Sequence, residues 1–127
     1  MVNDRKPPKL VESSFSTHIF SDDLQGTKIL FQVIKMLDSC IIFINDQNNL
    51  KFVDLSLAIQ SRFEREPLTT NLVGHGVDNS SVNLANKLNK RLKKLVYLSL
   101  NVEGDRLLLP GLEKRLYEEI KSRPEKF

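Results

Sequence analysis

Two hydrophobic periods follow one another directly in residues 82–102. The first recurs at helical spacing and comprises Leu84, Ala85, Leu88, Leu92 and Leu95. The second alternates along the chain and comprises Val96, Leu98, Leu100 and Val102. The joint between the two periods is too short for a free-standing loop. An amphipathic helix must therefore fold back over the sheet that the following strand joins, and their contact is the predicted core.

Before this helix the sequence predicts five strands, and after it one further helix. Alternating or β-branched apolar runs place the strands at 13–24, 28–37, 39–44, 53–59 and 68–73. A helix is the alternative for 28–37. Ser80 or Ser81 is the expected N-cap of the first helix. The last helix repeats Leu112, Leu116 and Ile120, with Pro110 in its first turn and Pro124 at its end.

This order of elements is typical of an α+β fold. Grouped strands joined by short turns favour an antiparallel sheet of about six strands, with the two helices on one face. Residues 1–11 are polar and contain prolines, so we expect a disordered leader there. Residues 12–127 then form a single domain.

The central strands carry more apolar surface than two helices can cover. Helices of about 12 residues are roughly 18 Å long and cover one side of a small sheet. Residues 28–44, however, are apolar at both parities, which indicates cover on both faces. We therefore expect the second face to stack on the sheet of a partner, either related or identical. The candidate residues for this dimer face are Ile34, Met36, Cys40, Ile42 and Ile44. Alternatively, the N-terminal strand and the loops cover it.

Residues with catalytic or metal-binding chemistry are sparse in this chain. His18 and His75 are the only histidines, and neither has metal-ligand spacing to Cys40 or to a pair of carboxylates. We expect no catalytic residue, metal or cofactor, and hence no enzyme. A small hydrolase or isomerase would need a pocket with convergent ionisable groups. The sequence predicts neither a membrane span nor a signal peptide, so we expect a cytoplasmic protein that can also be nuclear.

A run of basic residues is the clearest charge feature. No Asp or Glu occurs in residues 79–102, which contain Lys87, Lys90, Arg91 and Lys94 on the helix face away from the leucines. This stripe could contact phosphates or an acidic protein surface, or simply be solvated. A small nucleic-acid-binding module is the alternative function. Against it stand a net charge of only +3, the absence of tryptophan and the lack of an aromatic RNA-recognition motif.

Three segments resemble the proteasome assembly chaperone 4 family. They are LSLAIQSRFEREPLTTNLVG at residues 55–74, NLANKLNKRLKKLVYLSLNV at 83–102 and LEKRLYEEIKSRPEKF at 112–127. The resemblance extends over residues 15–127, and the order and spacing of the segments make it specific. Residues 1–11 have no clear counterpart in the family, and the turn at 45–49 departs from it in composition.

The resemblance implies a non-enzymatic chaperone that pairs with a related one, proteasome assembly chaperone 3. It also implies that the pair binds alpha subunits of the 20S proteasome during assembly of the alpha ring. The family fold is an antiparallel sheet with two helices, and the dimer stacks sheet on sheet. We expect alpha-subunit contacts among Arg62, Lys87, Lys90, Arg91 and Lys94, and a homodimer when the related chaperone is missing.

Overall fold

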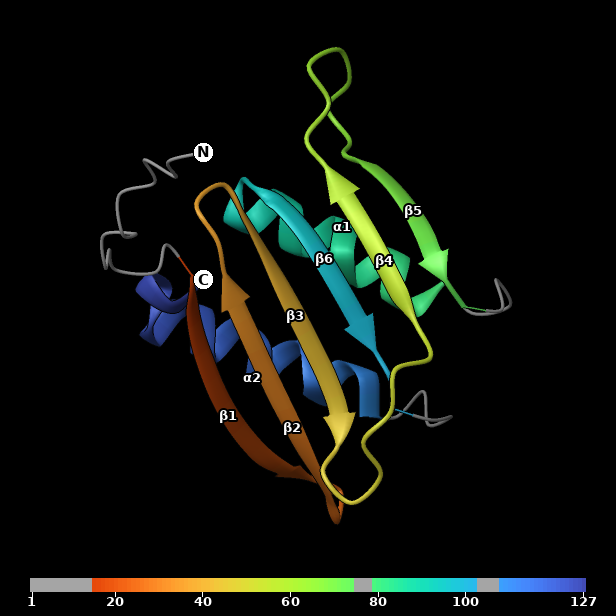
Figure 1. The fold of residues 1–127 in the computed structure, drawn as a ribbon, viewed down its shortest axis with the longest axis vertical. Coiled ribbons are helices and arrows are strands. Elements are labelled where there is room, and N and C mark those ends of the chain that lie inside the picture. Colours follow the sequence, from red (N-terminus) through yellow and green to blue (C-terminus); the bar gives the residue numbers. More distant parts are fainter. Residues whose placement is uncertain (1–14, 75–78, 103–107) are drawn as a thin grey trace, which may run out of the picture.

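A computed structural model describes residues 15–74, 79–102 and 108–127 of the chain, shown in Figure 1. These residues form one six-stranded sheet with two helices against it. The predicted leader at 1–11 and His75 lie outside the described residues. Within them, the α+β class is confirmed.

The sheet has the strand order β1-β2-β3-β6-β4-β5. Its strands are β1 Ser16–Leu24, β2 Thr27–Lys35, β3 Ser39–Asp46, β4 Leu55–Ile59, β5 Leu68–Val73 and β6 Leu95–Leu100. The strand prediction for 28–37 is therefore right, and the helical alternative is wrong. Adjacent strands are antiparallel except β3 and β6, which run parallel. The prediction of an antiparallel sheet is therefore wrong at the β3–β6 pair. The chain returns through a helix before β6 enters between β3 and β4, and such a crossover allows parallel pairing.

Both helices cover the same face of the sheet, behind the strands in Figure 1. Helix α1 comprises Ser80–Leu92 and packs against β4, β5 and β6, whereas α2 comprises Leu108–Ser122 and contacts β1. A short 3₁₀ helix, η1, follows at Pro124–Lys126. Leu88 of α1 and Leu98 of β6 are both fully buried in one hydrophobic cluster. The predicted return of the helix over the strand that follows it is thus confirmed.

The ends of α1 differ from the prediction at both termini. The N-cap is Asn79, without a side-chain cap hydrogen bond, so neither predicted serine caps the helix. The Ser81 hydroxyl instead donates to Asp54 Oδ1 at 3.0 Å, because a buried hydroxyl needs a partner. At the other end, Lys93 adopts a left-handed conformation with φ of 56°. This cap ends the helix, so Leu95 begins β6 instead of extending the helical stripe.

A polar network fixes the segment before β4 to the end of β6. The Asp54 carboxylate accepts hydrogen bonds from Asn71 Nδ2 at 2.9 Å and from the Leu100 backbone N–H at 3.1 Å. Its backbone carbonyl accepts one from the Ser99 hydroxyl at 2.7 Å. The buried Asn101 side chain accepts from the Val53 N–H at 2.9 Å. These bonds give the buried polar groups partners and hold β4 in register beside β6.

Glu119 joins α2 to the edge strand β1. Its buried carboxylate lies 2.9 Å from His18 Nε2 and 2.8 Å from Arg115 Nη1, and it also pairs with Arg123 at 3.1 Å. Burial alone would raise the pKa of Glu119. Hydrogen bonds from His18 and Arg115 and the charges of the two arginines outweigh burial, so its pKa lies below the ordinary value. The ionised carboxylate therefore stabilises the docking of α2 on β1.

The contacts of the Glu119 carboxylate predict a loss of stability in acid. A depressed folded pKa contributes stability above the ordinary carboxyl value of 4.5, and that contribution is lost as pH falls below it. We expect Glu119→Gln to lower the free energy of unfolding by about 1–3 kcal/mol at neutral pH. The difference from wild type should shrink in urea titrations below pH 4.5. The exposed Glu118→Gln is the matched control, and a pH-independent difference for Glu119→Gln would contradict this assignment.

Candidate functional site

The face of the sheet opposite the helices carries a continuous apolar row. Cross-strand partners point to the same side of a sheet, so residues paired in register share a face. One such row crosses all four central strands at Ile34, Ile41, Tyr97 and Leu57. Neither helix lies on this side, as Figure 1 shows. We call these four residues the central row and the side that carries it the open face.

Further apolar side chains surround the central row. Ile59 and Leu68 pair across β4 and β5, and Ile19 lies on β1. These three are 43–58% exposed. On β3 the Phe43 ring lies 6.4 Å from the ring of Phe52, which is also exposed. Such a contiguous apolar patch is uncommon on a monomeric soluble protein and is typical of a protein–protein interface.

The structure corrects the predicted dimer-face residues at most positions. Cys40, Ile42 and Ile44 are fully buried beneath the helices and cannot contact a partner. Ile34 does lie on the open face, and Met36 is half-buried in the turn after β2. The sequence-based prediction thus chose the parity of β3 that faces the helices, whereas Ile41, Phe43, Leu57 and Tyr97 lie on the open face. One signal in the sequence could have identified this face: Tyr97 alternates with Val96 and Leu98, which face the helices.

Cys40 has no reactive character in this position. Burial raises the pKa of its thiol to about 11, and the nearby Lys94 charge only partly opposes this. The thiol is free and buried. Thiolate chemistry is therefore suppressed at neutral pH.

The predicted basic contact residues mostly have partners within the chain. Lys87 pairs with Glu113 at 3.1 Å, and Lys90 pairs with Glu66 at 2.6 Å. The Arg91 guanidinium lies 4.9 Å from the centroid of the Tyr117 ring. These contacts connect α1 to α2 and to the β4–β5 loop. The helix therefore uses much of its positive charge internally.

The two other members of that set lie in different surroundings. Lys94 Nζ donates to the main-chain oxygen of Phe127, which ties the chain after α1 to the segment after α2. Arg62 lies exposed in the loop between β4 and β5, and no ion pair joins it to the residues that the structure describes. Four of the five predicted residues thus have a partner within the chain, and Arg62 is exposed.

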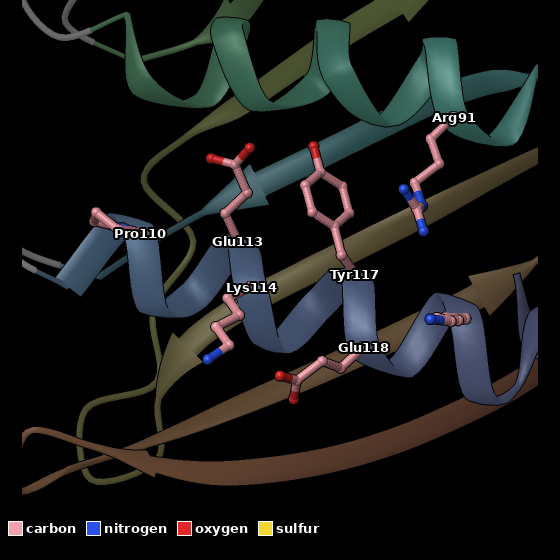
Figure 2. Close-up of a pocket in the computed structure, with 7 residues that line it drawn as sticks. Arg91, Pro110, Glu113, Lys114, Tyr117 and Glu118 are labelled. Carbon is pink, nitrogen blue, oxygen red and sulfur yellow. The ribbon is translucent and has the colours of Figure 1, made fainter.

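A shallow hollow of about 510 Å³ lies between α1 and α2, shown in Figure 2. Seven residues line it: Arg91, Pro110, Glu113, Lys114, Tyr117, Glu118 and Lys121. Burial and the neighbouring Glu113 together raise the pKa of the Tyr117 phenol to about 12, against the opposing charge of Arg91. A phenol with this pKa stays protonated at neutral pH. The lining contains no histidine, serine or cysteine to act as base or nucleophile.

Two further findings concern ligands and membranes. No three His, Cys, Asp or Glu side chains gather to hold a metal ion within residues 15–74, 79–102 and 108–127. In the same ranges, neither α1 nor α2 has the length and apolar character that a bilayer crossing requires. The open face is thus the surface that most needs an explanation.

The chain is similar to known proteins over most of its length. A family model described as Proteasome assembly chaperone 4 matches residues 28–102, more than half of the 127 residues. Human Proteasome assembly chaperone 4 is 32% identical over 113 residues, which cover 88% of this chain and 90% of that protein. The mouse protein of the same name is 31% identical over 117 residues, which cover 91% of this chain and 94% of that protein.

The fold is also similar to a solved structure. The similarity has a TM-score of 0.62 at 12% identity and covers 84% of this chain and 96% of the other. That structure is described as a novel chaperone complex for yeast 20S proteasome assembly. At this identity the likeness concerns the fold alone. The family match and the two mammalian relatives confirm the resemblance, and the chain belongs to the proteasome assembly chaperone 4 family.

Proposed function

We propose that this chain is a non-catalytic assembly chaperone that pairs through its open face with a related chaperone, proteasome assembly chaperone 3. The pair would then hold an alpha subunit of the 20S proteasome while the alpha ring assembles. Family membership supports the assembly role. The single observation that carries the pairing is the central row of Ile34, Ile41, Leu57 and Tyr97, which neither α1 nor α2 covers.

The physical case for pairing rests on burial of apolar surface. Stacked sheets pack about 10 Å apart, and their facing side chains interdigitate. Each apolar Å² removed from water contributes roughly 25 cal/mol, so an interface of this kind is favourable. The same surface would drive a homodimer when the related chaperone is missing. Such a homodimer would bury the same residues less complementarily.

The alpha subunit would contact a different part of the molecule. Covering the open face leaves the helix layer and the loops accessible for a client. Lys87, Lys90 and Arg91 lie on the outer side of α1, and part of each side chain remains exposed despite its internal partner. Partly paired charges give an interface that forms by electrostatic attraction and releases readily. This suits a chaperone that leaves before its product matures.

Two observations favour binding over chemistry or nucleic-acid recognition. The hollow between the helices holds a phenol that stays protonated and a glutamate, Glu113, already paired with Lys87. Lys87 and Lys90 of α1 are each paired with a carboxylate within the chain, which lowers the positive charge that the helix offers to phosphates. We further propose that the protein acts in the cytoplasm and also enters the nucleus.

The direct test is the mass of the complex. The purified chain is mixed with the related chaperone at micromolar concentration, and light scattering gives the mass. We expect one copy of each chain, and the pair should retain a recombinant 20S alpha subunit on a sizing column. A mass equal to one chain, both alone and in the mixture, would contradict the proposal.

A further inference from the structure

The loop between β4 and β5 presents a phenylalanine to solvent. Phe63 is 96% exposed, the highest value among the large apolar side chains that the structure describes. In Figure 1 this loop projects past the end of the sheet, at the top of the view. A phenylalanine gains much free energy when it leaves water, so a partner that buried this ring would gain affinity from it.

The loop is held in a defined shape by bonds at both ends. The Ser61 hydroxyl accepts hydrogen bonds from the backbone N–H groups of Phe63 at 3.2 Å and Glu64 at 3.1 Å. At the other end Pro67 is buried, and the Glu66 carboxylate lies 2.6 Å from Lys90 Nζ on α1. A segment ordered before binding loses less conformational entropy when it binds. The loop backbone around Phe63 is thus ordered before a partner binds.

The charges around Phe63 indicate the chemistry of that partner. Arg62 and Arg65 flank it and are exposed, and neither forms an ion pair within the described part of the chain. One nearby carboxylate, Glu66, is neutralised by Lys90, and Glu64 remains exposed. Arg62 directly precedes the aromatic residue and Arg65 follows it by two positions, and aromatic and arginine side chains are enriched at interfaces. This combination is complementary to an apolar pocket with an acidic rim.

The loop is placed to act independently of the open face. It continues β4 and β5 beyond the strand ends, and its Glu66 is tied to α1 on the helix side. A sheet stacked on the central row could reach Ile59 and Leu68 at the base of the loop, but residues 61–66 project beyond these strand ends and would stay accessible. We infer that residues 61–66 form a second docking element, in which the Phe63 ring enters an acidic-rimmed apolar pocket on the client alpha subunit. This inference rests on the proposed function.

The test compares two matched truncations in the complete chaperone pair. Phe63→Ala should weaken capture of the recombinant alpha subunit roughly 30-fold, the loss typical of one hot-spot side chain. Leu37→Ala is the control, because Leu37 is also highly exposed, at 82%, but lies in the β2–β3 turn. It should leave capture unchanged. The charge reversal Arg62→Glu with Arg65→Glu should weaken capture and reduce its dependence on salt.

The outcomes separate this inference from the function on which it rests. Equal capture by Phe63→Ala and wild type would overturn the inference and leave the chaperone role intact. Loss of the chaperone pair in Phe63→Ala would overturn it too, because the loop would then belong to the pairing interface. Binding of anionic phospholipid vesicles that depends on Phe63 would replace the protein pocket with a membrane surface. No capture by the wild-type pair would refute the proposed function itself.

Discussion

Replacing Ile41 by glutamate is expected to abolish pairing through the open face while the chain remains folded. Ile41 lies at the centre of the row formed with Ile34, Tyr97 and Leu57. In the single chain the new carboxylate can reach water, but in the pair it would be buried without a partner. A desolvated, unpaired charge costs several kcal/mol, so affinity should fall at least about 100-fold. Titration calorimetry with the related chaperone measures this loss.

The control variant places a new carboxylate on the other side of the molecule. Lys114→Glu introduces a carboxylate on the exposed surface of α2, in the helix layer. Its pairing affinity should equal that of wild type, and urea unfolding should show both variants folded. If Ile41→Glu pairs with wild-type affinity, the open face is not the pairing surface.

Truncating Phe31 is expected to give the largest loss of stability. Phe31 is fully buried beneath the helices, and its ring stacks on Phe20 with centroids 4.6 Å apart. Phe20 in turn contacts the Phe127 ring edge-on at 6.4 Å, so one aromatic cluster joins β1 and β2 to the last residue. Phe31→Ala removes this contact and leaves a cavity. We expect the free energy of unfolding to fall by about 3–5 kcal/mol.

The same substitution at an exposed site provides the comparison. Phe63→Ala should change the free energy of unfolding by less than about 0.5 kcal/mol, because its ring is 96% exposed. Urea titrations of the two variants measure both values. Similar midpoints for Phe31→Ala and wild type would mean that the aromatic cluster does not hold β1 and β2 to Phe127.

The sequence alone determined the class of fold and predicted more apolar sheet surface than two helices cover. Alternation of apolar residues is local, so Val96 and Leu98 identify β6, and Leu84 and Leu88 identify α1 without knowledge of the rest of the chain. The total apolar content of 28–44 exceeded what two helices can cover. The length of the helices and the parity of the apolar residues together predict an open face.

Only the tertiary structure decided which residues form that face. The residues on both faces of β3 are apolar. A shift of one residue along this strand would replace Ile41 and Phe43 on the open face by Cys40, Ile42 and Ile44. Which set the helices cover depends on pairing with β6, which enters from far along the chain and runs parallel to β3. The ion pairs of Lys87 and Lys90 likewise join segments distant in sequence. Such contacts depend on packing between elements, and local periodicity carries no information about them.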